Sequence, residues 1–211
     1  MALRVYLLPM LTREGLARLT LPAPGGTTTG RAGSASSSDR PSHRLPFAID
    51  SSELEALALG IRAAGVDLIP LPPRPLLPEM YNPVRRQYQC SHILRFAREL
   101  LEGLGGFQPR LLVLTDADVY EPGMSFTGGM AELGGRLSLV SLARLQSGER
   151  ERMVSRAVKE CLHELGHNLG LEHCRRRECV MFLSRTLADS DLKSASFCPA
   201  CRAILGRALM S

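Results

Sequence analysis

Eleven residues of this chain, which read HELGHNLGLEH, constrain its fold and chemistry more than any other stretch. In an α-helix each residue turns by about 100°, so His163 and His167 project about 40° apart and can bind one metal ion. Glu164 lies next to them without occupying a coordination position. Gly170 can adopt the positive φ that ends a helix, which would let His173 return to the metal as a third ligand.

Three neutral imidazoles leave one position of a tetrahedral zinc ion open for water, which is the arrangement of catalytic rather than structural zinc. The alternative is a pair of solvated helical histidines and an unrelated third one. Because five identities are fixed within eleven residues, we favour the metal site. The motif therefore predicts a zinc-dependent hydrolase.

The residues before the motif predict a long, rigid helix. Its apolar positions recur at three- and four-residue steps, which is typical of a helix with one buried face. These positions are Val154, Val158, Leu162, Leu165 and Leu169. Because metal geometry tolerates little drift, a rigid support of this kind suits the ligands.

Four of the six cysteines follow the motif and predict a second metal site. Cys174 and Cys179 form one close pair, and Cys198 and Cys201 form another. Two such pairs separated by a loop can bind a tetrahedral zinc ion from both sides, which gives two zinc ions per chain in all. Disulfides are the alternative, and the absence of a secretion signal disfavours them. A metal would also stabilise a segment that has little core of its own.

Composition argues against several other classes of protein. The net charge is +5, carried mostly by arginine, but the chain has no tryptophan and no basic stripe interleaved with aromatic residues, so no nucleic-acid partner is predicted. The N-terminus reads as a strand rather than a secretion signal, and no apolar run reaches the length of a membrane span. We expect a monomeric, cytoplasmic protein with no membrane partner.

The order of the predicted elements indicates the fold. Strands alternate with helices before the metal motif, whereas the chain beyond Gly170 has few strand signals. The expected strands cover 2–8, 66–69, 110–115, 125–132 and 136–142, and the expected helices before the motif cover 52–65 and 90–104. The last two strands should form a hairpin around Gly134 and Gly135. We expect an α/β (α+β) fold with an upper lobe over 1–170, a small lower lobe over 171–211 and a mobile loop over 22–46.

A methionine adds a family resemblance to these patterns. Met181 follows the three-histidine motif at the place where metzincins have a methionine on a turn beneath the metal. The adjacent cysteines narrow the match, because the chain is similar to the archaemetzincin family, which has a second zinc bound by four cysteines. Segments 81–88, 115–120 and 134–145 also resemble that family, so the resemblance covers about 80–203.

The resemblance implies a metzincin-like fold and a single metallopeptidase domain, with a mixed twisted sheet above the zinc helix and a mostly helical lower lobe. It also implies that the strand within 125–132 has an open edge that binds an extended peptide. We predict hydrolysis of peptide bonds in short or unfolded peptides, with Glu164 as general base for a zinc-activated water. Two alternatives are a zinc-binding interaction protein with vestigial proteolysis and a hydrolase of non-peptide amides.

Overall fold

The computed structural model describes residues 3–20, 49–104, 108–146 and 148–208. The predicted loop over 22–46 lies outside these ranges. The strands are β1 (Leu3–Leu11), β2 (Val66–Pro70), β3 (Arg74–Pro75), β4 (Tyr81–Asn82), β5 (Gln87–Gln89), β6 (Arg110–Thr115), β7 (Val119–Tyr120), β8 (Gly129–Ala131) and β9 (Leu137–Ser141). The helices are α1 (Arg13–Thr20), α2 (Ser51–Ala63), α3 (Cys90–Glu102), α4 (Arg150–Asn168), α5 (Leu187–Leu192) and α6 (Pro199–Ala208), with a 3₁₀ turn η1 (Pro78–Met80).

A mixed sheet forms the centre of the molecule, in the order β2-β1-β6-β9-β8, with β3 pairing onto the end of β1. Strands β2, β1, β6 and β9 are parallel, whereas β8 is antiparallel to β9 and lies at the edge. The central strand β6 is buried on both faces, as its near-continuous apolar run predicts. A second, small sheet joins β4, β5 and β7.

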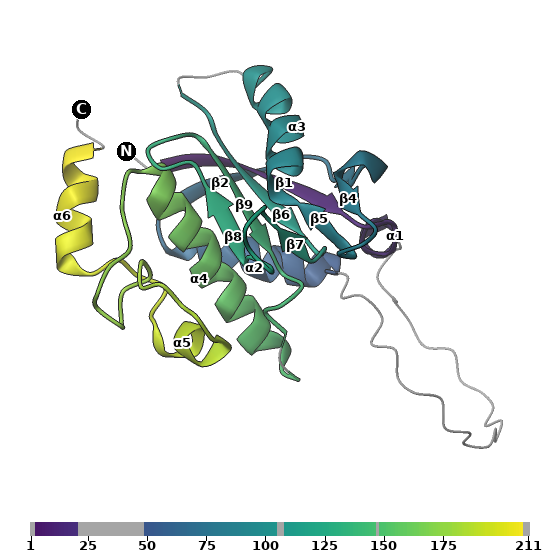
Figure 1. Ribbon diagram of the computed structural model, residues 1–211. Helices are drawn as coiled ribbons and strands as arrows, with labels where there is room; N and C mark the ends of the chain where they lie inside the picture. The colour runs from purple at the N-terminus through teal and green to yellow at the C-terminus, as the bar shows by residue number, and fades with distance from the viewer. Residues whose placement is uncertain (1–2, 21–48, 105–107, 147, 209–211) are drawn as a thin grey trace, which may run out of the picture.

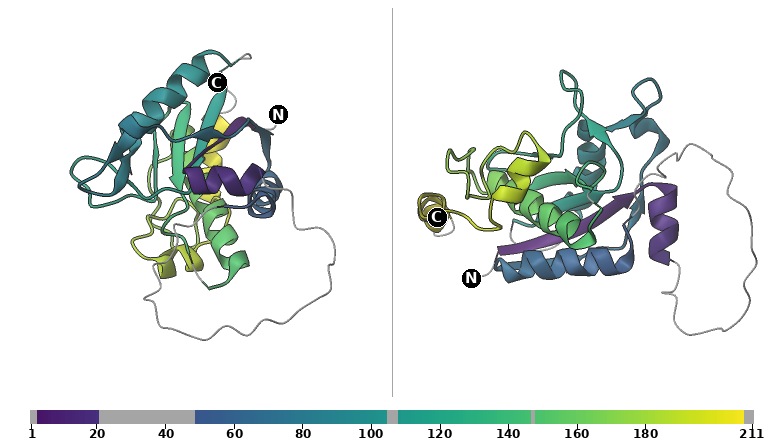
Figure 2. Two further views of the ribbon diagram at one scale, coloured as in Figure 1. Left: turned by 90° about the vertical axis from the view of Figure 1, so that its right-hand side faces the viewer. Right: turned by 90° about the horizontal axis from the view of Figure 1, so that it is seen from below.

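Helices cover the two faces of the central sheet (Figures 1 and 2). Side chains of a strand alternate between faces, and the two hydrophobic clusters follow that alternation. Leu112 and Leu114 pack in the cluster that contains α2 and α4. Leu111 and Val113 pack in the cluster that contains α3. The predicted mixed α/β fold is therefore confirmed, and α4 is seated on the sheet through one apolar face.

Local signals in the sequence account for the beginning of α2. Asp50 is the N-cap, and its side chain accepts a hydrogen bond of 2.8 Å from the backbone N–H of Glu53. The Glu53 carboxylate accepts one in return from the backbone N–H of Asp50 at 3.0 Å. This reciprocal capping box satisfies two N–H groups that have no partner within the helix.

The hairpin is formed as predicted, but its first strand is much shorter than the expected range 125–132. Only Gly129–Ala131 pairs with β9. The reason is that polar side chains hold the preceding loop away from the ladder. The Arg85 guanidinium donates to the carbonyl groups of Met124 and Ser125, at 2.7 and 3.0 Å, and the Gln87 amide donates to Ser125 as well, at 3.1 Å.

Helix α4 ends at Asn168, two residues before the predicted glycine. Gly170 has a φ of 84°, a left-handed conformation that glycine adopts without steric cost. Beyond it, residues 171–208 contain α5, α6 and loops, with no strand assigned there. None of the helices in the described part of the chain is both long and apolar enough to cross a membrane.

Candidate metal centres and active site

The three motif histidines meet at one point between α4 and the loop that follows it. His163 and His167 lie one turn apart on α4, and their Nε2 atoms are 3.1 Å apart. The ring of His173 approaches both, with centroid distances of 5.2 and 4.8 Å. One possible ligand atom from each residue lies within 4.8 Å of the others. We call these three residues the histidine centre.

The turn after α4 brings the third histidine back and also orients the second one. The N–H of Leu171 donates to the carbonyl group of Gly166, and the N–H of Gly170 donates to that of His167, both at 2.9 Å. These two bonds define a Schellman motif, which reverses the chain after a helix. The carbonyl group of Leu171 then accepts a hydrogen bond of 2.7 Å from Nδ1 of His167. The carbonyl group of the reversed segment therefore fixes the orientation of the His167 ring.

The donor set of the histidine centre fits a zinc ion. Nδ1 of His163 donates to the carbonyl group of Val180 at 2.9 Å, just as Nδ1 of His167 donates to Leu171. Burial lowers the pKa of His163 to about 3, so its Nε2 carries a lone pair at neutral pH. This lone pair faces Nε2 of His167 at 3.1 Å, an arrangement that suits a cation held by both rings. Nitrogens bound to one tetrahedral zinc ion lie about 3.3 Å apart, close to the observed separation.

Glu164 lies beside the histidines on the same helix and is almost fully buried. Burial, assisted by the nearby Glu160 carboxylate, raises the pKa of its carboxyl group to about 8. On the other side is the edge strand: a Cβ atom at Gly129 would lie only 2.5 Å from Oε1 of Glu164. The carboxyl group therefore lies between α4 and the backbone of β8.

The four cysteines of the predicted second site also converge. Sγ of Cys174 is 3.9 Å from that of Cys198, and Sγ of Cys179 is 3.8 Å from that of Cys201. A disulfide needs about 2.05 Å, so these are thiols, whereas sulfurs bound to one tetrahedral zinc ion lie about 3.8 Å apart. A backbone hydrogen bond from Cys201 lowers the pKa of the Cys198 thiol to about 7. We call these four residues the cysteine centre.

Three consecutive residues, Cys179, Val180 and Met181, connect the two centres. Cys179 belongs to the cysteine centre, and the carbonyl group of Val180 holds the ring of His163. Met181 is fully buried beneath α4, where a Cβ atom at Gly166 would be 2.3 Å from its sulfur. A glycine within the HELGH sequence thus lets the methionine turn pack directly against the helix.

The helix is also tied to the hairpin by a residue that the motif analysis did not single out. The side-chain amide of Asn168 donates to the carbonyl groups of Glu132 and Leu137, at 3.0 and 2.9 Å. These carbonyl groups flank the turn between β8 and β9. Asn168 therefore fixes the distance between α4 and the edge strand.

A cavity of about 1740 Å³ opens over the histidine centre. Residues of β8 and of the loop before it line one wall, and residues of α5 and of the loop before it line another. Partly exposed apolar residues line this rim: Met124, Phe126, Leu133, Leu183 and Leu187. An extended chain in this cavity would run along a free sheet edge and past Glu164.

Comparison with known proteins identifies the family. The profile described as Peptidase family M54 matches residues 68–207. The chain belongs to the archaemetzincin family. The curated archaemetzincin of Methanopyrus kandleri is 44% identical over 137 residues, which cover 64% of this chain and 76% of that protein. That of Archaeoglobus fulgidus is 37% identical over 157 residues, which cover 74% of this chain and 92% of that protein.

A solved structure has the same fold. The crystal structure of the archaemetzincin from Methanopyrus kandleri superimposes with a TM-score of 0.69 at 29% sequence identity, over 100% of this chain and 97% of that one. The predicted family, fold and enzyme class are therefore confirmed. This archaemetzincin is a zinc-dependent metallopeptidase.

Two further cysteines and two aspartates lie outside both centres, where they pack in the core or hold loops in place. Cys90 and Cys161 are buried core thiols apart from the cysteine centre. Asp116 accepts hydrogen bonds from the backbone N–H and the hydroxyl group of Thr12, at 2.8 and 2.7 Å, and so organises the start of α1. Asp118 accepts two bonds of 2.8 Å from Arg144, whose guanidinium lies 4.0 Å above the ring of Phe126 at the cavity rim.

The close approach of β8 to Glu164 gives a testable expectation for this archaemetzincin. Gly129→Ala should lower kcat on the order of 100-fold. The new Cβ atom would lie too close to the Glu164 carboxyl group and displace it, and a displacement of about 1 Å can cost a rate factor of this size. The measurement is steady-state hydrolysis of a peptide, with zinc content as a check. Gly128→Ala is the matched control, since a Cβ atom there meets nothing within 4 Å. Equal rates for the two variants would contradict this role of Gly129.

Proposed function

We propose that the histidine centre of this archaemetzincin binds the catalytic zinc ion and that Glu164 is the general base. The proposed ligands are His163, His167 and His173. The observation that carries the proposal is the pair of Nε2 atoms that face each other at 3.1 Å while both Nδ1 atoms donate to carbonyl groups. A hydrogen bond to the second ring nitrogen is the usual way in which proteins orient a metal-binding histidine.

The chain's own residues then have distinct tasks in peptide hydrolysis. Zinc, when bound, acidifies a water molecule and polarises the scissile carbonyl group. Glu164 accepts the proton of the attacking water on its carboxylate and returns it to the leaving amine. Gly129 and the helix backbone keep that carboxylate in place. No tyrosine occurs between residues 121 and 211, so the segment after the motif contributes no phenol hydroxyl to this reaction.

The proposed substrate is a short or unfolded peptide in extended conformation. Within the described chain β8 pairs with β9 alone, so no strand pairs with its other edge, and its residues line the cavity next to Glu164. A peptide that pairs with this edge places its backbone across the histidine centre. A folded protein offers few segments that can adopt this arrangement, whereas a flexible peptide adopts it readily.

The cysteine centre is proposed to hold a second, structural zinc ion. Its four ligands are Cys174, Cys179, Cys198 and Cys201, two of which are buried. Thiols in this geometry suit a reducing compartment, so we propose the cytoplasm as the location. Because one chain supplies both centres, we propose that the monomer is active, with residues 1–170 as the upper lobe and 171–211 as the lower lobe of a single domain.

Metal content and peptide cleavage measured on one sample test this proposal. We expect the full chain, purified without oxygen, to contain two zinc ions and to shield four thiols until a chelator is added. It should also cleave internally quenched peptides. One zinc ion with oxidised cysteines would overturn the structural site. Cleavage of small acylated amides but of no peptide would favour the amide hydrolase, and zinc without any cleavage would favour an interaction protein.

A further inference from the structure

Glu160 is a second carboxylate in the cavity, and hydrolysis as proposed above does not use it. It lies one helical turn before Glu164 on α4 and lines the cavity together with His163. Across from it are Leu187 and Ser190 of α5, which line the same region. The Glu160 side chain is 14% exposed, so it is largely shielded from solvent while it faces the space beside the catalytic centre.

A buried lysine balances the charge of Glu160 from the protein side. Nζ of Lys193 lies 3.0 Å from Oε1 of Glu160, and the lysine side chain is 0% exposed. Ser190 donates its hydroxyl group to the same Oε1 at 3.3 Å. Lys193 is not among the residues that line the cavity. Within the described chain, both polar contacts of this carboxylate therefore fall on one oxygen.

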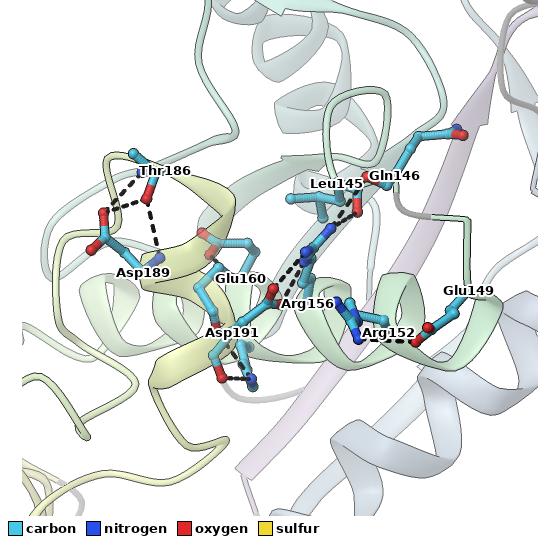
Figure 3. A network of polar contacts seen from close by, with 11 residues as sticks. Leu145, Gln146, Glu149, Arg152, Arg156, Glu160, Thr186, Asp189 and Asp191 are labelled. Atoms are coloured by element: carbon cyan, nitrogen blue, oxygen red, sulfur yellow. Dashed lines mark hydrogen bonds and ion pairs between the residues drawn. The ribbon is translucent and has the colours of Figure 1, made fainter.

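The wall opposite Glu160 is held rigidly by further charges of α4 (Figure 3). The Arg156 guanidinium donates two hydrogen bonds of 2.6 Å to the Asp191 carboxylate and a third of 3.1 Å to the carbonyl group of Leu145. Lys159 donates from Nζ to the carbonyl groups of Ser190 and Asp191, at 3.0 and 3.2 Å. Helix α5 is thereby fixed against α4, so the space next to Glu160 has a set width.

We infer that Glu160 determines specificity: it accepts a hydrogen bond from a substrate side chain that ends in a neutral donor, such as the amide of glutamine. The inference rests on the proposed function of the histidine centre. A carboxylate can only accept hydrogen bonds, and it has about four lone-pair positions. In Glu160 the hydroxyl group of Ser190 uses one of them, and Nζ of Lys193 lies beside the same oxygen as an ion pair.

The charges around Glu160 rank the possible side chains. An acidic side chain would face a carboxylate of the same sign. An apolar side chain would cover Glu160 and leave its second oxygen without a partner, which is costly. A basic side chain would gain the attraction of Glu160 but would also meet the ammonium group of Lys193 behind it. A neutral donor satisfies the free oxygen without either penalty.

The test compares peptides that differ at one side chain of nearly constant length. Internally quenched peptides carry Gln, Met, Glu or Lys on either side of the scissile bond, and kcat/KM is measured for each. We expect the kcat/KM of the glutamine peptide to exceed that of the methionine peptide by up to about 100-fold, the cost of leaving a buried acceptor unpaired. We expect the glutamate peptide to be cleaved at least as slowly as the methionine peptide, because its carboxylate repels that of Glu160. In the double variant E160L/K193M, the ratio of glutamine to methionine should fall to about one or below.

The double variant replaces a buried ion pair by apolar groups of similar volume, a change that folded proteins tolerate better than removal of one partner. The matched control is E149L/R152M, which removes an exposed ion pair of 3.1 Å on the same helix and should leave the profile unchanged. If the first variant fails to fold, E160Q/K193M serves instead. In that variant we expect the kcat/KM of the glutamate peptide to rise toward that of the glutamine peptide, because the repelling carboxylate has been removed.

The outcomes separate this inference from the proposed function. Equal cleavage of the glutamine, methionine and glutamate peptides by the wild type overturns the inference, as does an unchanged preference in a folded double variant. If the wild type cleaves no peptide, the proposed function fails. Fluorescence anisotropy with the same peptides then decides the inference, which requires tighter binding of the glutamine peptide than of the methionine peptide.

Discussion

Glu164→Gln is expected to lower the kcat for peptide hydrolysis by about 10²–10⁴-fold, the usual contribution of a general acid–base group. Glutamine has nearly the same shape as glutamate, so the buried side chain should keep its place between α4 and Gly129. Its amide, however, cannot accept a proton. Zinc content should stay the same, because Glu164 does not belong to the proposed ligand set.

The pKa of Glu164 adds a reason for this large effect. In the chain without metal, burial raises the pKa of Glu164 to about 8, so that the carboxyl group is mostly protonated at neutral pH. A divalent cation bound nearby would lower the pKa of this carboxyl group and so increase the share of its base form. Single-turnover kinetics with Glu151→Gln as the control variant measures the effect, since Glu151 is an exposed residue of the same helix. An unchanged rate in Glu164→Gln would rule out Glu164 as the base.

Cys201→Ser is expected to destabilise the chain by about 4 kcal/mol or more, since the loss of a metal site is among the few single changes with so large an effect. Residues 171–208 contain no assigned strand, and their buried apolar residues, Cys201 among them, pack in the core cluster that also contains residues of α2 and α4. Binding of structural zinc contributes about 10–16 kcal/mol in isolated zinc-finger peptides, and it contributes directly to folding. We expect one zinc ion fewer per chain and selective proteolysis after Gly170.

The matched control is Cys90→Ala, which removes a thiol that is equally buried but lies in the other hydrophobic cluster. That variant should lose about 1 kcal/mol, the typical cost of a single substitution, and keep its zinc content. Urea denaturation with zinc analysis before and after measures both quantities. If Cys201→Ser keeps its full zinc content and stability, the cysteine centre does not hold a structural metal.

Residues close together in the chain could be assigned from the sequence alone. The 100° step of a helix brings His163 and His167 together, and Gly170 ends the helix with the predicted positive φ. Asp50 caps α2 through a residue three positions away. In each case the geometry is decided within one or two turns of chain, which is the range over which sequence patterns act.

Contacts between distant segments could not be predicted in this way. Glu164 and Gly129 are 35 residues apart in the sequence, and Glu160 and Lys193 are 33 apart. No helical or strand periodicity extends over such separations, so these contacts could not be read from a local pattern. The predicted length of β8 was too great for the same reason. Arg85, from a separate segment of the chain, donates hydrogen bonds to the carbonyl groups of residues 124 and 125, which therefore do not join the strand. Alternation of residue types indicates a strand, but it does not reveal which distant side chain ends its pairing.

The tripeptide Cys179-Val180-Met181 has a thermodynamic consequence if both centres bind zinc as proposed. Its first residue is a ligand of one ion, and its second orients His163, a ligand of the other. Binding at either centre then restricts the same three residues, so each ion should raise the affinity for the other. Such coupling is reciprocal: the factor by which the cysteine-bound zinc tightens the catalytic one equals the factor in the opposite direction. In a cell short of zinc, a chain of this kind would pass from empty to doubly loaded over a narrow range of free metal.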